Sequence, residues 1–265
     1  MKRVFAGVLA VLLAATVARA EPALRLSTTT STEASGLLTY LLPYFEKSSG
    51  IKVDVIAVGT GKALALAKNG DVDVTLVHAR ALEDKFVADG DGIDRRDVMY
   101  NDFVLAGPLK DPAGVKGGKD VVAAFRQIAG SGASFISRGD GSGTEVMEQR
   151  YWQLAGTRPP TAHYLAAGQG MGEVLNMAAQ LQAYTLSDRA TFSTYKAKTG
   201  LAVLVEGDAR MANPYGIIAV NPARHKGINY PGARKLIEWI TAADGQRLIA
   251  QFRPDGEQLF FPGRR

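Results

Sequence analysis

Four short stretches of the sequence place glycine and hydroxyl side chains where an apolar run ends and a helical pattern begins. They are STTTSTEASG at 27–36, VGTGKA at 58–63, SRGDGSGTEV at 137–146 and AAGQGMGEV at 166–174. The first turn of a helix has backbone N–H groups without helical partners, and the helix dipole adds partial positive charge there. Because an ordinary capped helix needs one such loop anyway, it is the occurrence of four that favours anion binding.

The stretch SRGDGSGTEV adds a cation to these donors. Arg138 offers a planar guanidinium that binds an oxyanion through parallel hydrogen bonds, and Asp140 is close enough in sequence to pair with it. Ser142, Gly143 and Thr144 then supply hydroxyls and backbone donors at the start of the next helix. A surface Arg–Asp pair beside a helix cap is the alternative that these residues leave open.

Catalytic patterns are incomplete in the same stretch. A nucleophile elbow centred on Ser142 requires glycine two residues before and after it, where the chain has Asp140 and Thr144. We therefore predict no catalytic residue and no enzyme. The alternative from a different class is a secreted phosphate-ester hydrolase, in which Arg138 binds phosphate and Ser142 or Thr144 attacks it.

Side chains that commonly bind metals are scarce. The chain has no cysteine, which excludes disulfides, thiolate metal sites and a lipid-modified N-terminal cysteine. Its three histidines, His78, His163 and His225, lie far apart in the sequence and have none of the spacings typical of a metal site. We predict no metal site and no cofactor, and we interpret each histidine as a surface or packing residue.

The first twenty residues are typical of a secretory signal peptide. Lys2 and Arg3 precede the apolar run VFAGVLAVLLAATV, and an Ala-x-Ala cleavage site ends at Ala20. A single-pass anchor is the alternative, although the run is short for crossing a bilayer. We expect residues 1–20 to be removed and the mature protein to reach the periplasm without a lipid anchor.

Removal of the signal peptide changes the charge of the chain. The full chain carries 31 basic and 26 acidic residues, and the mature chain keeps 28 of the basic ones. A formal charge near neutrality, with no basic run longer than two residues, does not suit nucleic acid or an anionic membrane surface. We expect a monomer with no nucleic-acid partner.

Strand-like and helical patterns alternate along the mature chain. Short apolar runs such as LRLST and VDVTLVHA alternate with helical segments such as SGLLTYLLPYFEKSSG, in which leucines and Phe45 repeat at steps of three and four. Gly50 is placed to end that helix. This alternation predicts an α/β fold in which mostly parallel sheets are flanked by helices.

Two long extended segments divide this pattern. VMYNDFVLAGP at 98–108 and ANPYGIIAVNP at 212–222 bracket a second α/β unit. We expect two lobes, with residues 21–105 and 213–265 in lobe I and residues 106–212 inserted as lobe II. Ligands of open α/β sheets bind at the carboxyl ends of strands, so the four loops are expected to meet in a cleft between the lobes.

The loop sequences together resemble one family. The segments STTTSTEASGLL, VGTGKALALAKNGDVDVTLVHA, SRGDGSGTEVMEQRYW and YTLSDRATF are similar to segments of the periplasmic tungstate-binding proteins of ABC-type oxyanion importers. The resemblance covers nearly the whole mature chain. It implies a two-lobed type II periplasmic binding protein that closes on one tetrahedral oxyanion, tungstate or molybdate, and delivers it to a membrane permease.

Two alternatives to this interpretation remain open. Phosphate-binding proteins of the same class carry a segment similar to SRGDGSGT, so phosphate is an alternative ligand. A sensor that presents the bound anion to a membrane receptor would share the same sequence features.

The resemblance also implies where the ligand binds. Within the hydroxyl-rich segment, Thr32 and Ser35 are interpreted as helix-capping or solvent-facing, and Thr28 is less favoured than the three residues after it. YTLSDRATF, with Ser187 and Asp188, is left out because a strand followed by a capped helix explains it equally well. The expected oxyanion-binding residues are Thr29, Thr30, Ser31, Gly59, Thr60, Gly61, Arg138, Ser142, Gly143 and Thr144, with Asp140 supporting Arg138.

The charge state of the ligand sets what the site must offer. Tungstate and molybdate are fully deprotonated dianions near neutral pH, so their site needs donors and no free carboxylate. An unpaired buried carboxylate costs several kcal/mol, whereas each charge-assisted donor contributes roughly 1.5–3 kcal/mol. Phosphate retains a proton and gains from an acceptor. Asp140 therefore distinguishes the ligands: paired with Arg138 it favours tungstate, and turned toward the cleft it favours phosphate.

Overall fold

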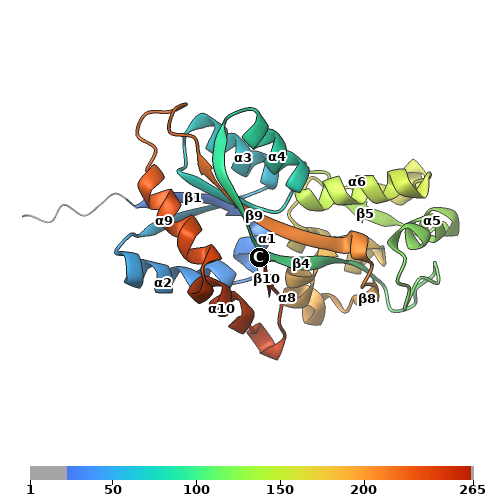
Figure 1. The fold of residues 1–265 in the computed structure, drawn as a ribbon. Helices are drawn as coiled ribbons and strands as arrows, with labels where there is room; N and C mark the ends of the chain where they lie inside the picture. Colours follow the sequence, from blue (N-terminus) through green and yellow to red (C-terminus); the bar gives the residue numbers. More distant parts are fainter. Residues whose placement is uncertain (1–22, 264–265) are drawn as a thin grey trace, which may run out of the picture.

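The computed structural model describes residues 23–263 of the chain (Figure 1). The predicted signal peptide, residues 1–20, lies outside the described residues. Within the range 23–263, no helix combines the length and the apolar character needed to cross a membrane. The chain folds into strands and helices that alternate as the sequence pattern predicts.

The first lobe begins with three parallel strands and the helices that follow them. Strand β1 (Leu24–Thr29) lies between β2 (Val53–Val58) and β3 (Val74–Val77) and pairs in parallel with both. Gly50 ends the leucine-rich helix in the left-handed conformation, with φ of 73°, as the sequence predicts. The helices are α1 (Thr30–Ala34), α2 (Leu37–Ser49), α3 (Thr60–Asn69) and α4 (Arg80–Ala88).

Two long strands run from one lobe into the other. Strands β4 (Gly92–Gly107) and β9 (Ala212–Val220) pair antiparallel with each other, and β9 also pairs antiparallel with β3. Figure 1 shows β4 in green and β9 in orange crossing between the two halves of the molecule. The two extended segments expected from the sequence are therefore the strands that connect the lobes.

The second lobe repeats the strand-and-helix pattern. Its elements are α5 (Val121–Ser131), β5 (Phe135–Ser137), α6 (Gly143–Ala155), β6 (Tyr164–Ala166), α7 (Met171–Leu181), β7 (Thr185–Asp188), α8 (Arg189–Thr199) and β8 (Ala202–Val205). Strands β5 and β6 are parallel, and β7 and β8 pair antiparallel with β4. The chain then returns through β9 to the first lobe and adds α9 (Tyr230–Thr241), α10 (Ala243–Gln251) and β10 (Phe261–Pro262).

Separate hydrophobic cores support the two lobes. Met99 of β4 packs in one core with α2 and α9, whereas Phe103 of the same strand packs in another with α5 and α6. Met211, just before β9, packs in the core that contains Phe103, whereas Tyr215 of β9 packs in the core that contains Met99. The chain therefore passes from one hydrophobic core to the other near the middle of β4 and near the start of β9. The lobe limits at 105/106 and 212/213 stay a prediction.

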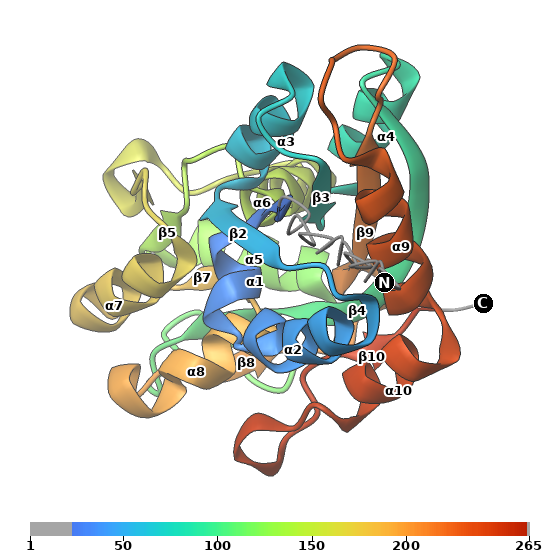
Figure 2. The same cartoon turned by 90° about the vertical axis from the view of Figure 1, so that its left-hand side faces the viewer.

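The strand directions bring the predicted loops together. The parallel strands β1, β2 and β3 end at one edge of the first sheet, and β5 and β6 end together in the second lobe. Helix α1, which follows β1, contacts α7 and α8 of the second lobe. Figure 2 shows this arrangement, with α1 in blue facing the gold and orange helices.

Candidate functional site

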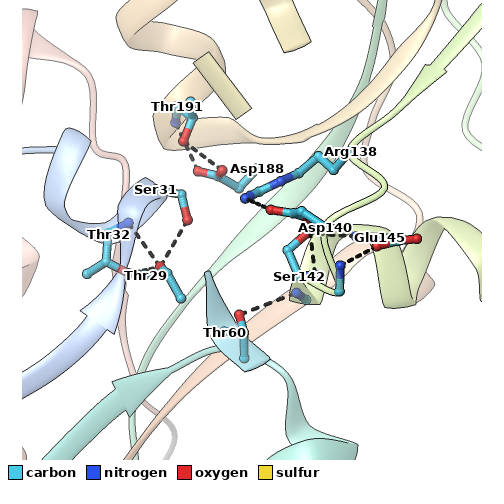
Figure 3. A network of polar contacts seen from close by, with 12 residues as sticks. Thr29, Ser31, Thr32, Thr60, Arg138, Asp140, Ser142, Glu145, Asp188 and Thr191 are labelled. Atoms are coloured by element: carbon cyan, nitrogen blue, oxygen red, sulfur yellow. Dashed lines mark hydrogen bonds and ion pairs between the residues drawn. The ribbon is translucent and has the colours of Figure 1, made fainter. Parts of the chain in front are cut away.

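Strand β1 ends, and α1 begins, in a buried group of hydroxyls. Thr29 caps α1: its Oγ1 accepts from the Thr32 N–H at 3.1 Å and lies 2.7 Å from Thr32 Oγ1. Ser31 Oγ lies 3.0 Å from Thr29 Oγ1 (Figure 3). Thr29 and Ser31 are each only 3% exposed, whereas Thr30 is exposed. The inward hydroxyls of this segment are thus those of Thr29 and Ser31.

The remaining hydroxyls of the segment stabilise the fold. Ser27 Oγ donates to the Ala63 carbonyl at 3.1 Å, and Thr28 Oγ1 donates to the Leu76 carbonyl at 2.8 Å. Ser35 Oγ donates to the Thr32 carbonyl at 2.6 Å. The high density of hydroxyls therefore has two causes, since some bond the backbone and others lie at the junction of the lobes.

The loop after β5 presents the guanidinium of Arg138. Arg138 is 3% exposed, and its Nη2 donates to Asp140 Oδ2 at 2.5 Å. The other carboxylate oxygen of Asp140 accepts from the Ser142 N–H at 3.1 Å. Ser142 caps α6, its Oγ accepting from the Glu145 N–H at 3.3 Å. Each oxygen of Asp140 thus accepts one hydrogen bond, and the carboxylate supports Arg138 (Figure 3).

Two buried donors on this loop lack a hydrogen-bond partner. Neither Arg138 Nε nor Thr144 Oγ1 has one among the described residues, although both atoms are shielded from solvent. A buried polar group without a partner costs about 1–3 kcal/mol, so such groups are rare in folded proteins. An anion held at the start of α6 would supply the missing acceptors.

The two lobes touch beside these donors. The Gly143 N–H, at the first residue of α6, donates to Thr60 Oγ1, at the first residue of α3, at 3.3 Å. A Cβ built on Gly59 would lie 3.8 Å from Asp140 Oδ2, and one on Gly61 would lie 3.8 Å from the Gly141 carbonyl oxygen. The loop after β2 therefore lies beside the loop after β5, at a distance where a Cβ on either glycine would make ordinary contact.

Two cavities flank the junction. One, of about 180 Å³, is lined by residues that include Thr30, Ser31, Gly170 and Thr191, and it brings the stretch AAGQGMGEV to the rim of the site. The other, of about 410 Å³, reaches His78 and Gly143 from the side of the connecting strands. Thr30 therefore stands at the edge of the site rather than among its buried hydroxyls.

His78 is a buried polar residue of the site that sequence reasoning missed. It follows β3, and its Nε2 lies 3.2 Å from both Ser31 Oγ and Thr29 Oγ1. On its other side, Nδ1 lies 3.0 Å from Asn213 Oδ1, and the ring stacks on Tyr215 at 4.6 Å. His78 therefore packs in the interior, as one of the two predicted roles requires, but its hydrogen bonds to the inward hydroxyls were not predicted.

Asp188 is the second residue that the prediction left out. It ends β7, is fully buried, and caps α8 by accepting from the N–H of Thr191 at 2.9 Å and from its Oγ1 at 2.7 Å. Its negative charge acts on the neighbouring His78 and raises the pKa of that ring, against the larger lowering that burial causes. The available sequence signals were the position of Asp188 at a strand end and the family resemblance of YTLSDRATF.

The structure places most of the predicted set at one junction. The residues buried there are Thr29, Ser31, Thr60, Arg138, Ser142 and Thr144, and Gly143 packs among them. Gly59 is partly buried, while Thr30 and Gly61 are exposed. Among residues 23–263 no cluster of His, Asp and Glu suits a metal ion. Chemically, the junction combines a guanidinium, hydroxyls and a helix start, which suits an oxyanion.

Comparison with known proteins identifies the family. Residues 16–244 match the family model described as a PBP superfamily domain. The tungstate-binding protein TupA of Peptoclostridium acidaminophilum is 48% identical over 248 residues, covering 92% of this chain and 87% of the relative. The chain belongs to the family of periplasmic tungstate-binding proteins. The resemblance predicted from its loop sequences is confirmed.

Solved structures of this family share the fold. The tungstate ABC transporter protein from Geobacter sulfurreducens is 54% identical and superposes with a TM-score of 0.82, covering 88% of this chain and all of that one. TupA from Desulfovibrio alaskensis G20 is 44% identical with a TM-score of 0.79, covering 92% of this chain and all of that one. The predicted two-lobed α/β fold of the type II periplasmic binding class is therefore confirmed.

Proposed function

We propose that the mature protein captures tungstate in the periplasm, as a monomer, and delivers it to the permease of an ABC importer. The observation that carries the proposal is the pair of buried, unpartnered donors at the start of α6, Arg138 Nε and Thr144 Oγ1. Curated relatives named for tungstate binding support the choice of ligand. Molybdate, which has the same charge and shape, is the second expected ligand.

The surrounding carboxylates support a dianion over phosphate. Asp140 receives hydrogen bonds from Arg138 and the Ser142 N–H, and Asp188 receives two from Thr191. Each oxygen thus accepts one hydrogen bond from the protein, so neither carboxylate is left unpartnered to receive the proton that phosphate carries. A fully deprotonated anion needs donors only, and each charge-assisted donor contributes about 1.5–3 kcal/mol.

Binding is inferred to be the whole function, without catalysis. The family is a class of solute-binding proteins. In the hydrolase alternative Ser142 would attack a phosphate ester, but its Oγ caps α6 by accepting from the Glu145 N–H. Among the described residues no hydrogen bond links this hydroxyl to a base that would take its proton.

Thermal unfolding with a panel of anions tests the proposed ligand. Tungstate at about a thousand times its Kd should add about 4 kcal/mol to the free energy of unfolding, because it binds only the folded protein. Sulfate and phosphate at the same concentration should add little. Greater stabilisation by phosphate than by tungstate would contradict the proposal, and hydrolysis of a phosphate ester by the purified protein would restore the enzyme alternative.

Ser31→Ala should weaken tungstate binding about tenfold, because it removes a buried hydroxyl donor to a charged ligand. Thr30→Ala is the matched control: its hydroxyl lies at the exposed edge of the same segment, so Kd should change by less than about twofold. Calorimetric titration measures both values. An unchanged Kd for Ser31→Ala would show that backbone donors or Thr29 carry this part of the site.

A further inference from the structure

We propose that His78 takes up one proton when the dianion binds and releases it when the dianion leaves. Its protonated ring would direct the hydroxyls of Thr29 and Ser31 toward the ligand, so that affinity depends on pH. This inference deepens the proposed function and rests on it. His78 is thereby a positioning residue, which acts on the ligand through the hydroxyls that it bonds.

The orientation of the Asn213 amide indicates the role of each ring nitrogen of His78. The Asn213 amide nitrogen donates to Asn101 Oδ1 at 2.7 Å, which leaves Asn213 Oδ1 as an acceptor for the Nδ1–H of His78 at 3.0 Å. In the neutral ring, Nε2 then carries a lone pair and accepts a hydroxyl proton. Thr29 and Ser31 both lie within 3.2 Å of it. One hydroxyl proton of the cluster is therefore held by His78 and is not available to an anion.

The surroundings keep His78 neutral before the ligand arrives. Burial lowers the pKa of its ring below the ordinary value, and the positive charge of Arg138 acts in the same direction. Asp188 and the bond to Asn213 oppose this lowering. Tyr215, stacked on the ring, is uncharged because its own burial raises its pKa well above the ordinary value. The cavity that His78 lines also contains Arg80, Arg150 and Arg210.

Charge balance favours protonation once the dianion is in place. Arg138 and Asp140 form an ion pair with no net charge, and Asp188 adds one buried negative charge. A bound dianion would add two negative charges to that of Asp188. The site would then hold three buried negative charges in addition to the neutral Arg138–Asp140 pair. Among these groups His78 is the one whose ordinary pKa lies close to neutrality, so it gains a proton most readily. Its positive charge offsets one of the negative charges.

Proton uptake and release take place at Nε2 of His78. A proton from the solvent adds to Nε2 of His78, and Nδ1 keeps the proton that it donates to Asn213. The new Nε2–H donates to the oxygen of Thr29 or Ser31, so that the hydroxyl proton formerly held by Nε2 turns toward the anion. When the anion leaves, the proton returns from Nε2 to the solvent.

Calorimetry of the mature wild-type protein tests proton uptake directly. Tungstate is titrated at one pH in buffers that differ in their heat of ionisation, and the slope of the observed heat against that heat gives the protons taken up. We expect uptake of up to one proton per tungstate bound. Kd should rise with pH by up to tenfold per unit between the pKa of His78 in the free protein, which lies below the ordinary value, and its higher pKa in the complex.

A variant pair assigns the proton to a residue. His78→Gln keeps hydrogen-bonding capacity without titrating, so proton uptake should vanish and Kd should not vary with pH. His163→Gln, which makes the same substitution in the second lobe away from the site, should keep the wild-type behaviour. If His78→Gln does not fold, the buffer series on the wild-type protein still decides whether a proton is taken up.

The outcomes separate this inference from the proposed function. Tight tungstate binding with no proton uptake in the wild-type protein would overturn the role of His78 and leave the proposed function intact. Wild-type pH dependence in His78→Gln would overturn it as well, because another group would then take the proton. Absence of tungstate binding at every pH would instead refute the proposed function.

Discussion

Arg138→Ala is expected to weaken tungstate binding by about 30- to 5,000-fold, because truncating one partner of a buried charge pair costs about 2–5 kcal/mol. Arg138 is the buried cation of the site, and its Nε is free to bind an acceptor. Calorimetric titration measures the loss. Arg247→Ala, which removes the same charge from an exposed position on α10, is the matched control and should leave Kd unchanged.

The loss in Arg138→Ala has two parts that a second variant separates. Without the guanidinium, Asp140 is left unpaired beside the anion and repels it. In the double variant Arg138→Ala, Asp140→Asn, that repulsion is absent, and part of the affinity should return. Wild-type affinity in Arg138→Ala itself would remove this residue from the site and would contradict the proposed geometry.

Gly143→Ala should weaken binding about a hundredfold through a steric effect. A Cβ on Gly143 would lie 2.8 Å from the His78 carbonyl oxygen of the other lobe, too close for two well-packed atoms. Forcing extra atoms into a packed contact costs about 1–3 kcal/mol, and the shift would also draw the Gly143 N–H away from Thr60. The lobes would then fail to close fully on the ligand.

The control for Gly143→Ala lies in the same lobe. Gly130, within α5, has open space around the position of a Cβ, so Gly130→Ala should keep wild-type affinity. The ligand-free Gly143→Ala protein should unfold at a similar temperature to the wild type, because the clash arises only where the lobes meet. Wild-type affinity in Gly143→Ala would show that ligand binding does not require this contact.

The architecture was largely predictable because periodic patterns and strand-end loops are local features. The leucine-rich pattern up to Gly50 predicted α2, and the extended segments predicted β4 and β9. Parallel strands end at one edge of a sheet, which is why loops distant in sequence could be assigned to one site. The family resemblance of these loops added the ligand class.

It was harder to predict which hydroxyls of residues 27–36 are buried. Thr30 looked equivalent to its neighbours in the sequence, but β1 ends at Thr29 and the short helix α1 begins at once. This change from strand to helix turns Thr30 outward while Thr29 and Ser31 stay buried. A single-turn helix of five residues leaves no periodic signal that would have revealed the change.

His78 and Asp188 were missed for a related reason. His78 directly follows β3 and Asp188 ends β7, and neither belongs to a motif that would assign it to a ligand site. Their role depends on contacts between segments far apart in the chain, such as His78 with Asn213. The available signal was their position at strand ends, where the hydroxyl and arginine loops also lie.

Competitive calorimetry tests whether the site selects tungstate over phosphate. The mature, ligand-stripped protein is titrated with tungstate alone, and then with tungstate after saturation with phosphate, in the same buffer. We expect one tungstate bound per chain, with an apparent affinity that excess phosphate barely lowers, because the carboxylates of the site already accept hydrogen bonds from the protein. Tight phosphate binding that blocks tungstate would mean that a carboxylate of the site accepts the phosphate proton. It would contradict the proposed selectivity for tungstate.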